Sequence, residues 1–310
     1  MKSPLSSLPP TKLRDLPRTF ILGELGKYYG SNPPDQAVEV DYSLWRCAET
    51  GLEFAWPMRP GNAEFYEWVS QFPSYYPGIR WEYGQVRRLI GEIGSSPKIL
   101  DVGCGKGDFL RLLDGVSVTD KYALDMNEPA VTACRQLGFH SFCGTMETAA
   151  QAGFIAPGQF PAVTSFHCLE HVEDPVSFCR SMLALVAPGG RLFVSTPYSP
   201  MSFESDWFDV MNHPPHHMTR WNLQAYQKLA DLLGVKMRWS APPSSVRRRA
   251  LAEFKLHRYP PHRPIPKPKL LADLILNFPE FLRLYRRQSR RGRDDGGIPA
   301  DVILVEFIKP

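Results

Sequence analysis

Residues 98–110 read KILDVGCGKGDFL, and this stretch decides the fold. An apolar run ends at Asp101, glycines follow at alternate positions, and an amphipathic segment comes next. This order is typical of a β-strand, a tight turn and the start of a helix. Gly103, Gly105 and Gly107 lack a Cβ, so they can adopt positive φ angles and allow a ligand to lie against the backbone. The turn therefore predicts a binding site for a small molecule.

The glycine spacing argues against a dinucleotide ligand. The dinucleotide fingerprint G-x-G-x-x-G needs a glycine at its sixth position, where this chain has Asp108. A second acid, Asp125, ends the next apolar segment, which is where a carboxylate at the tip of a second strand binds ribose hydroxyls. The pattern therefore favours a ligand with a ribose and disfavours a pyrophosphate on the loop.

These residues resemble the class I S-adenosylmethionine (SAM) methyltransferases of types 11 and 23. In that family a D-x-G-x-G-x-G loop holds the methionine part of SAM and the acid after the second strand holds the ribose. Two later motifs extend the resemblance to about residues 80–240. Residues 165–175, SFHCLEHVEDP, resemble a signature of small-molecule methyltransferases related to the ubiquinone-biosynthesis enzymes, and residues 187–197, APGGRLFVSTP, match their turn into the fifth strand.

The resemblance implies a SAM site, with S-adenosylhomocysteine as the product. Thr145 and Met146 follow the third strand, where the family covers the adenine, and Met126 would lie on the other face. Both methionines could equally fill the core. The expected cofactor-binding residues are Asp101, Gly103, Cys104, Gly105, Gly107, Asp125, Met126, Thr145, Met146 and His167.

Strands and helices alternate from residue 98 onward, which predicts a parallel sheet with ligands at the carboxyl ends of its strands. The expected strands are 98–102, 122–125, 141–143, 162–167, 191–196, 235–240 and 302–308, and the expected helices are 109–113, 128–137, 175–186 and 223–233. The predicted fold class is α/β, a seven-stranded Rossmann-like doubly wound sheet with an antiparallel last strand. An N-terminal extension and a basic helical insertion before the last strand complete it.

Four regions are expected along the chain: residues 1–80, 81–245, 246–297 and 298–310. The first contains an extended arm with a short helix near residues 22–29, and a hairpin at 41–54 that resembles half of a zinc ribbon found before bacterial methyltransferase domains. Only Cys47 remains of its four thiolates, so we expect a hairpin without zinc. In the aromatic stretch that follows, Tyr76, Arg80 and Trp81 are candidates for ligand contact.

Composition adds expectations about compartment and partners. The 310 residues are 43% hydrophobic, enough for a full core, and no apolar run suggests a signal peptide or a membrane span. The cysteines form no C-x-x-C pair, so we expect reduced thiols in a cytoplasmic protein. The net charge is +4, yet residues 246–293 hold 14 Lys and Arg against 3 acids, so the remainder is acidic.

That basic segment has the pattern of an amphipathic helix pair. It can lie on an anionic membrane surface at the inner membrane face, cover a phosphorylated substrate, or be a solvated flap. Nucleic acid is disfavoured, because the segment has few aromatics for base stacking. In addition, residues 196–199, TPYS, replace the N-P-P-Y turn of methyltransferases that act on exocyclic base amines.

His171 is the first candidate catalytic residue. Methyl transfer to a hydroxyl needs alignment and removal of a proton, for which a histidine is suited. His171 follows the fourth strand on the cofactor side, and Glu170 could orient it. The alternative is a histidine that packs against or caps the next helix.

A second group of candidates lies at residues 212–222, NHPPHHMTRWN, which resemble the PPHHxTxW segment of methyltransferases in polysaccharide and glycolipid gene neighbourhoods. In an extended segment His216 and His217 point to opposite sides, so at most one would face the acceptor. Arg220 could hold a phosphate or carboxylate of the acceptor. A metal site of His213, His216 and His217 lacks a carboxylate at helical spacing, so no metal is expected; structural capping is the alternative.

The predicted function is SAM-dependent methyl transfer to a small molecule, with a hydroxyl of a sugar, glycolipid or other carrier-linked metabolite as the favoured acceptor. Two alternatives remain: a non-catalytic SAM-binding assembly or regulatory protein, and an RNA methyltransferase that uses the basic insertion. The sequence does not determine the acceptor or the oligomeric state.

Overall fold

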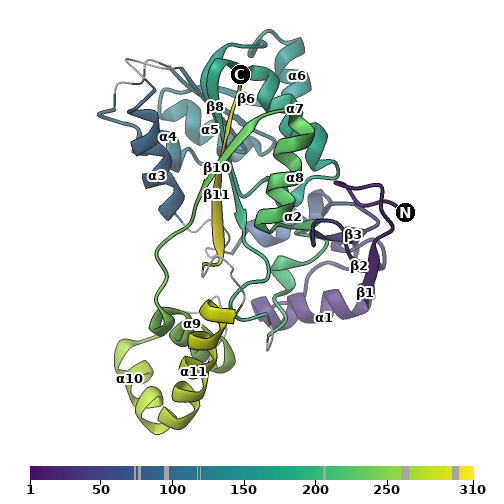
Figure 1. Ribbon diagram of the computed structural model, residues 1–310, viewed down its shortest axis with the longest axis vertical. Helices are drawn as coiled ribbons and strands as arrows, with labels where there is room; N and C mark the ends of the chain where they lie inside the picture. Colours follow the sequence, from purple (N-terminus) through teal and green to yellow (C-terminus); the bar gives the residue numbers. More distant parts are fainter. Residues whose placement is uncertain are drawn as a thin grey trace.

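The computed structural model describes residues 1–72, 75, 78–93, 98–116, 118, 120–204, 207–259, 265–294 and 300–310, with the backbone alone at 291–294. Its centre is a seven-stranded sheet with the order β10-β11-β8-β7-β4-β5-β6 (Figure 1). The strands are β4 (Ile99–Val102), β5 (Lys121–Asp125), β6 (His140–Cys143), β7 (Phe160–Phe166), β8 (Val186–Pro197), β10 (Lys236–Ser240) and β11 (Val302–Ile308). β11 pairs antiparallel with both neighbours and the pairs from β8 to β6 are parallel. The predicted fold class is confirmed.

Helices cover both faces of this sheet (Figure 1). One face packs against α6 (Met146–Gln151), α7 (Pro175–Leu185) and α8 (Leu223–Leu233), and the other against α3 (Trp81–Ile90), α4 (Asp108–Leu112) and α5 (Glu128–Gln136). The central strands are buried on both sides, as the continuous apolar runs in the sequence require. Because ligands of such sheets bind at the carboxyl ends of the parallel strands, we expect the site at the end of the sheet where β4, β5 and β7 terminate.

Two predicted strand limits need correction. The fourth parallel strand was expected to reach His167, but β7 ends at Phe166 because His167 has a φ angle of 53°. A residue in the left-handed region cannot continue a strand. β8 begins at Val186, five residues before the expected start at Arg191.

The N-terminal arm is more structured than the sequence suggested. It holds β1 (Thr11–Leu16), α1 (Arg18–Tyr29), and η1 (Asp35–Ala37), and it is followed by β2 (Tyr42–Arg46), β3 (Glu53–Trp56) and α2 (Ala63–Ser70). Leu16, Ile21 and Leu25 are buried in a core that includes Phe65 and Trp68, so the arm folds onto the region that follows it. The expected hairpin is confirmed as β2 and β3.

A second sheet, with the order β1-β2-β3-β9, joins this N-terminal region to the second histidine segment. β9 (Thr219–Arg220) comes from that segment and pairs antiparallel with Glu53 and Phe54 of β3. Two backbone hydrogen bonds extend the junction, from Ala55 N to the Met218 carbonyl and from Gly61 N to the Pro215 carbonyl, both at 2.8 Å. The N-terminal region thereby holds the histidine segment in place.

The basic insertion consists of α9 (Val246–Arg258), α10 (Lys267–Leu276) and α11 (Phe278–Asp294), which lie apart from the sheet (Figure 1). The sequence predicted the last two helices and missed α9. Phe254 and Leu284 form a small core there. Buried Gln288 donates to the Ser202 carbonyl at 2.7 Å and ties the helices to the rest of the molecule. Within the described part of the chain, none of the helices has both the length and the apolar character needed to cross a membrane.

Candidate functional site

The glycine loop after β4 has the conformation that the sequence predicts. Gly103, Gly105 and Gly107 have φ angles of 75°, 52° and 77°. A Cβ on Gly103 would lie 2.1 Å from the Cys168 Sγ, so only glycine fits between the loop and the chain that follows β7. The loop therefore lies directly against the start of η3 (Leu169–His171).

Asp125 stands at the carboxyl end of β5 with its carboxylate held by the backbone. Its Oδ2 accepts from Gly105 N at 2.8 Å and its Oδ1 accepts from Asn127 N at 2.9 Å. The side chain is partly exposed, so its remaining lone pairs are available to a ligand. The next residue, Met126, is 76% exposed, an unusual position for a large apolar side chain. We define the glycine loop, Asp101 and Asp125 as the cofactor edge.

Asp101 is the buried member of the cofactor edge. It is 2% exposed and accepts a hydrogen bond from the Thr164 hydroxyl at 2.7 Å. Burial raises the pKa of Asp101 to about 7; the Thr164 hydrogen bond opposes this and the negative charge of Asp125 adds to it. A cationic group bound at the loop would favour the ionised carboxylate and lower this pKa.

Three of the expected cofactor residues use their side chains elsewhere. The Cys104 thiol is buried 3.8 Å from the Cys134 Sγ. The Thr145 hydroxyl accepts from Thr148 N at 3.2 Å and caps α6, and Met146 packs on the core beneath that helix. These contacts stabilise the edge of the sheet, and binding of a ligand by these three residues stays a prediction.

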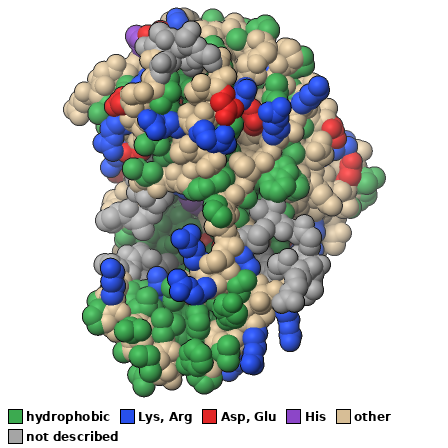
Figure 2. Space-filling model, turned by 60° about the vertical axis from the view of Figure 1, so that its left-hand side comes forward, with side chains coloured by type: hydrophobic (Ala, Val, Ile, Leu, Met, Phe, Trp, Pro, Cys, Tyr) green, Lys and Arg blue, Asp and Glu red, His purple; other side chains and the backbone are tan. Residues whose placement is uncertain are grey.

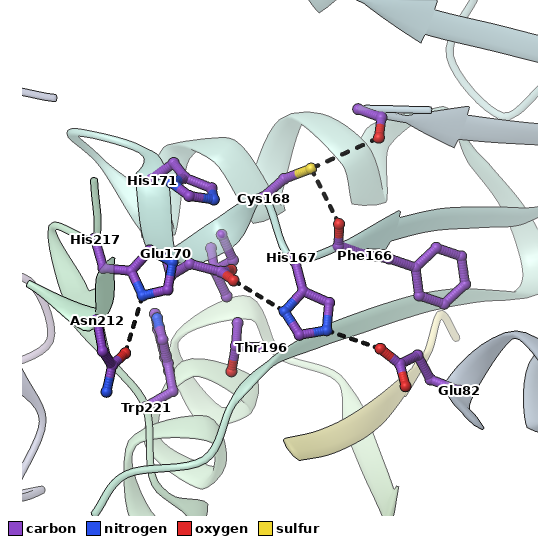
Figure 3. Close-up of polar contacts among 12 residues, drawn as sticks. Glu82, Phe166, His167, Cys168, Glu170, His171, Thr196, Asn212, His217 and Trp221 are labelled. Carbon is purple, nitrogen blue, oxygen red and sulfur yellow. Dashed lines mark hydrogen bonds and ion pairs between the residues drawn. The ribbon is translucent and has the colours of Figure 1, made fainter. Parts of the chain in front are cut away.

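His167, also expected to bind the cofactor, is held between two glutamates (Figure 3). Its Nε2 lies 2.7 Å from the Glu82 Oε1 and its Nδ1 lies 3.3 Å from the Glu170 Oε1. Burial alone would lower the pKa of His167, but the two carboxylates outweigh it and raise the pKa. The imidazolium links α3 to η3. Glu82 was not predicted from the sequence, where it is only an acid in the first turn of a helix.

His171, His216 and His217 come together in what we call the histidine cluster. One ring nitrogen of each lies within 4.8 Å of the corresponding atoms of the other two. The centroid of the His171 ring lies 4.5 Å from that of the His216 ring and 4.8 Å from that of the His217 ring. In an extended segment His216 and His217 would point to opposite sides, but here their rings stack with centroids 4.5 Å apart. Both backbone N–H groups donate to the His213 carbonyl, so the segment turns and does not extend.

Each ring of the histidine cluster has its Nδ1 beside an oxygen acceptor. His171 Nδ1 donates to the His216 carbonyl at 2.6 Å, His216 Nδ1 to the Met211 carbonyl at 2.8 Å, and His217 Nδ1 to the Asn212 Oδ1 at 2.9 Å. A proton on Nδ1 leaves Nε2 with its lone pair. Burial lowers the pKa of all three rings, most strongly for His216 and His217, and keeps them neutral.

The orienting partner of His171 differs from the prediction. Glu170 was expected to hold this ring, but a backbone carbonyl does so, and Glu170 faces His167 (Figure 3). The reason is the short η3 turn, which places neighbouring side chains on different sides. Glu170 is 1% exposed, and neither carboxylate oxygen makes a hydrogen bond within the described residues.

Arg220 does not offer its charge to an acceptor. Its guanidinium lies 2.5 Å from Glu204 and 3.2 Å from Glu53, and it donates to the His213 Nε2 at 2.6 Å. Glu204 in turn accepts from the Asn212 amide at 2.7 Å, which fixes the amide so that its oxygen faces the histidine cluster. Arg220 is therefore a positioning residue, and Asn212 and Glu204 are members of the site that the sequence did not reveal.

Aromatic rings surround the histidine cluster. Tyr66 of α2 lies 6.3 Å from His171 between ring centroids, and Tyr75 lies 5.7 Å from His216. His216 and His217 are each 8% exposed, whereas His171 is partly exposed, so the cluster opens on the His171 side.

Of the three aromatic-stretch candidates, Tyr76 lies outside the described residues. Trp81 is the first residue of α3 and packs against the core on that face of the sheet, and Arg80 precedes the helix.

Comparison with known proteins identifies the family. A family described as "Methyltransferase domain" matches residues 82–238, which contain both the cofactor edge and the histidine cluster. The chain belongs to this methyltransferase domain family. Its members take the methyl group from SAM.

Two relatives of the methyltransferase domain are named "Ubiquinone biosynthesis O-methyltransferase". The protein of Pseudomonas aeruginosa (strain LESB58) is 39% identical over 104 residues, 32% of this chain and 44% of the relative. The protein of Bordetella bronchiseptica is 32% identical over 137 residues, 43% of this chain and 56% of the relative. The chain therefore spans about half the length of these curated relatives.

Among solved structures, a methyltransferase in complex with the Haloferax volcanii Trm112 activator aligns with a TM-score of 0.51. The identity is 15%, and the alignment covers 74% of this chain and 90% of the other. At this identity the likeness concerns the fold alone.

The cofactor edge fits SAM. Asp125 presents a fixed, partly exposed carboxylate that would hold the ribose hydroxyls, and exposed Met126 would cover one face of the adenine. The glycine loop would leave room for the methionine part, and Asp101 would supply negative charge to a cationic group there when it is ionised. SAM bound in this way supplies an electrophilic methyl group to an acceptor at the same end of the sheet.

Proposed function

We propose that this methyltransferase domain transfers the methyl group of SAM to a hydroxyl of a small-molecule acceptor bound against the histidine cluster. The observation that supports it is the meeting of three neutral imidazoles beside the cofactor edge, with one ring nitrogen of each within 4.8 Å of the others. The glycine loop packs on Cys168, and His171 follows three residues later. The proposed sites for the methyl donor, SAM, and for the methyl acceptor are therefore next to each other.

The chemistry requires one bond to form as another breaks. The acceptor oxygen bonds to the methyl carbon, the carbon–sulfur bond breaks, S-adenosylhomocysteine leaves, and the hydroxyl proton must be removed. A neutral imidazole with a free lone pair can take that proton or weaken its bond. His171 is partly exposed, whereas His216 and His217 are each 8% exposed, so our proposal has the acceptor approach from the His171 side.

Oxygen is our proposed acceptor atom because the curated relatives are named O-methyltransferases. A sugar or another metabolite on a lipid or nucleotide carrier is our proposed acceptor class, on the resemblance of residues 212–222. A non-catalytic SAM-binding protein would not need three convergent lone pairs at this position.

We also propose that the basic helices contact an anionic membrane surface, where a lipid-linked acceptor would lie. Leu271, Ile275, Leu276 and Phe278 are 61%, 68%, 78% and 56% exposed. Figure 2 shows this apolar face with Lys and Arg side chains along its margins. An apolar face with a basic rim inserts into the headgroup region of anionic bilayers.

The first experiment incubates labelled SAM and the protein with lipid, soluble-metabolite and RNA fractions of the source organism. Label in a lipid or sugar-nucleotide fraction, absent with Asp125→Ala, supports the proposal. Label confined to RNA, or no label despite measured SAM binding, contradicts it.

The membrane contact is tested with vesicles of phosphatidylglycerol and of phosphatidylcholine. We expect sedimentation with the anionic vesicles alone and its loss in Ile275→Asp. Leu232→Asp is the matched control, because Leu232 is 43% exposed on α8, away from the basic helices. Equal binding by both variants would contradict the contact.

A further inference from the structure

The histidine cluster brings one ring nitrogen from each of three histidines within 4.8 Å of the other two. Each Nδ1 lies beside an oxygen acceptor, so a neutral ring in this state carries its lone pair on Nε2. The His216 Nε2 is buried and has no hydrogen-bond partner within the described residues. A buried acceptor without a partner is costly, so the site is stabilised by a group that takes up these lone pairs, and a metal ion can take up all three at once.

We propose that His171, His216 and His217 bind a divalent first-row transition-metal ion of the zinc class. Neutral imidazoles are preferred ligands of zinc, iron, cobalt, nickel and copper, whereas magnesium and calcium prefer oxygen. A metal about 2.1 Å from each nitrogen needs these atoms roughly 3 to 3.5 Å apart. They lie within 4.8 Å of one another, so small rotations of the rings close the site.

The surroundings of the cluster have the features of a metal site's outer shell. Metal-ligating histidines usually donate their other N–H to a carbonyl or carboxylate, which fixes the ring and its tautomer. Here all three rings do so, and the acceptor of His217 is itself held by Glu204, which pairs with Arg220. This network holds the His217 ring in its orientation and also ties β9 to β3 through Arg220 and Glu53.

Glu170 adds negative charge beside the cluster. Its carboxylate is buried, makes no hydrogen bond within the described residues, and lies between His217 and His167 in Figure 3. The charged group facing it is the His167 ring, which it shares with Glu82. A cation held by the three histidines would be stabilised by Glu170.

This ligand set replaces the one considered from the sequence. There, His213 was grouped with His216 and His217, and no metal was expected because a carboxylate was lacking. In the structure the His213 Nε2 accepts from Arg220 and its Nδ1 faces the Asp209 carbonyl, so His213 is not available. His171, 45 positions before His216, takes its place.

Metal binding by the histidine cluster does not depend on the proposed function. Only the role of the metal in methyl transfer rests on it. Three protein ligands leave open positions on a zinc-class ion, which face the partly exposed side of His171. An acceptor hydroxyl bound there would lose its proton more readily, because the metal's charge stabilises the alkoxide. This would favour acceptors that place a hydroxyl beside a second oxygen.

The test titrates Co²⁺ into the full chain after removal of metals with a chelator. We expect one Co²⁺ per chain, with visible d–d absorption, without a sulfur-to-metal charge-transfer band, and displaced by Zn²⁺ but not by Mg²⁺. The absence of saturable Co²⁺ binding, or a charge-transfer band that assigns the ion to cysteines, would overturn the proposal.

Variants locate the ion. His216→Ala and His217→Ala should each weaken Co²⁺ binding by roughly 100-fold or more, and Asn212→Leu by roughly 10-fold to 100-fold through the outer shell. His140→Ala is the matched control, because His140 is exposed on β6. Far-ultraviolet circular dichroism and SAM binding verify folding. Unchanged Co²⁺ binding in folded His216 and His217 variants would overturn the proposal.

Separate readouts distinguish this inference from the proposed function. Co²⁺ binding at the cluster without label in any acceptor fraction supports the metal site and contradicts methyl transfer. Label transferred by chelator-treated protein that binds no Co²⁺ supports methyl transfer and overturns the metal site.

Discussion

The cofactor edge and the histidine cluster lie next to each other but are built in different ways. The cofactor edge uses backbone conformation and two acids within 25 positions of the chain, Asp101 and Asp125. The histidine cluster joins side chains 45 positions apart and depends on β9, which pairs with the N-terminal hairpin. The proposed SAM site is thus built from residues close together in the chain, whereas the proposed site for the methyl acceptor depends on long-range packing.

This difference predicts that the two regions can be damaged separately. Changes at the cofactor edge should affect SAM affinity and leave the histidine cluster intact. Changes in the cluster or in the residues that orient it should affect turnover and metal binding and leave SAM affinity intact.

The largest effect is expected for His171→Ala. Loss of the exposed ring of the cluster should lower the rate of methyl transfer by roughly 100-fold to 10,000-fold, the range for a positioned group that handles a proton. The rate is measured with the acceptor fraction that the wild type labels, and SAM affinity by calorimetry should not change. His140→Ala is the control, and a full rate in His171→Ala would exclude His171 from the chemistry.

A smaller effect, on binding alone, is expected for Asp125→Ala. The ribose would lose two charge-assisted hydrogen bonds, worth about 3 kcal/mol together, so SAM affinity should fall by roughly 100-fold. Calorimetric titration with SAM measures this, and Asp231→Ala, exposed on α8, is the control. Co²⁺ binding should remain, and its loss would show that the two regions are not separable.

Asn212→Leu tests the residues behind the histidine cluster. The substitution removes the acceptor of His217 and the donor to Glu204, which should cost about 1–3 kcal/mol of unfolding free energy. Urea denaturation measures the loss, with Gln136→Leu at the exposed end of α5 as the control. Turnover should fall with SAM affinity unchanged; a stability equal to the control would mean that this network does not hold the cluster.

The smallest effect concerns pH and the buried acid of the cofactor edge. Because the pKa of Asp101 is raised to about 7, its favourable contribution to stability is present at low pH and is lost as the pH rises through 7. Asp101→Asn removes this dependence. The melting temperature of the variant, relative to wild type, should therefore rise by a few degrees from pH 5 to pH 8, since 1 kcal/mol is roughly 2–4 °C. If the melting temperatures of wild type and Asp101→Asn change with pH in the same way, Asp101 does not have the raised pKa that its burial predicts.

The sequence by itself determined the sheet and the cofactor edge. The alternation of strands and helices, the glycine loop and the acid Asp125 are local patterns, and parallel strands bring their carboxyl ends to one edge wherever the crossovers run. The cap of α8 is a local feature of the same kind, because Asn222 directly precedes the helix and accepts from Ala225 N at 2.8 Å.

Only the tertiary structure decided which histidines meet. The direction of a side chain depends on the backbone angles at its turn, and the turn at residues 213–217 reversed the expectation for His216 and His217. The charge of Arg220 looked available in the sequence, but it is neutralised by Glu53 and Glu204, which reach it from other parts of the chain. Local patterns fix backbone geometry, whereas the partners of a buried polar side chain are chosen by the long-range packing that removes it from water.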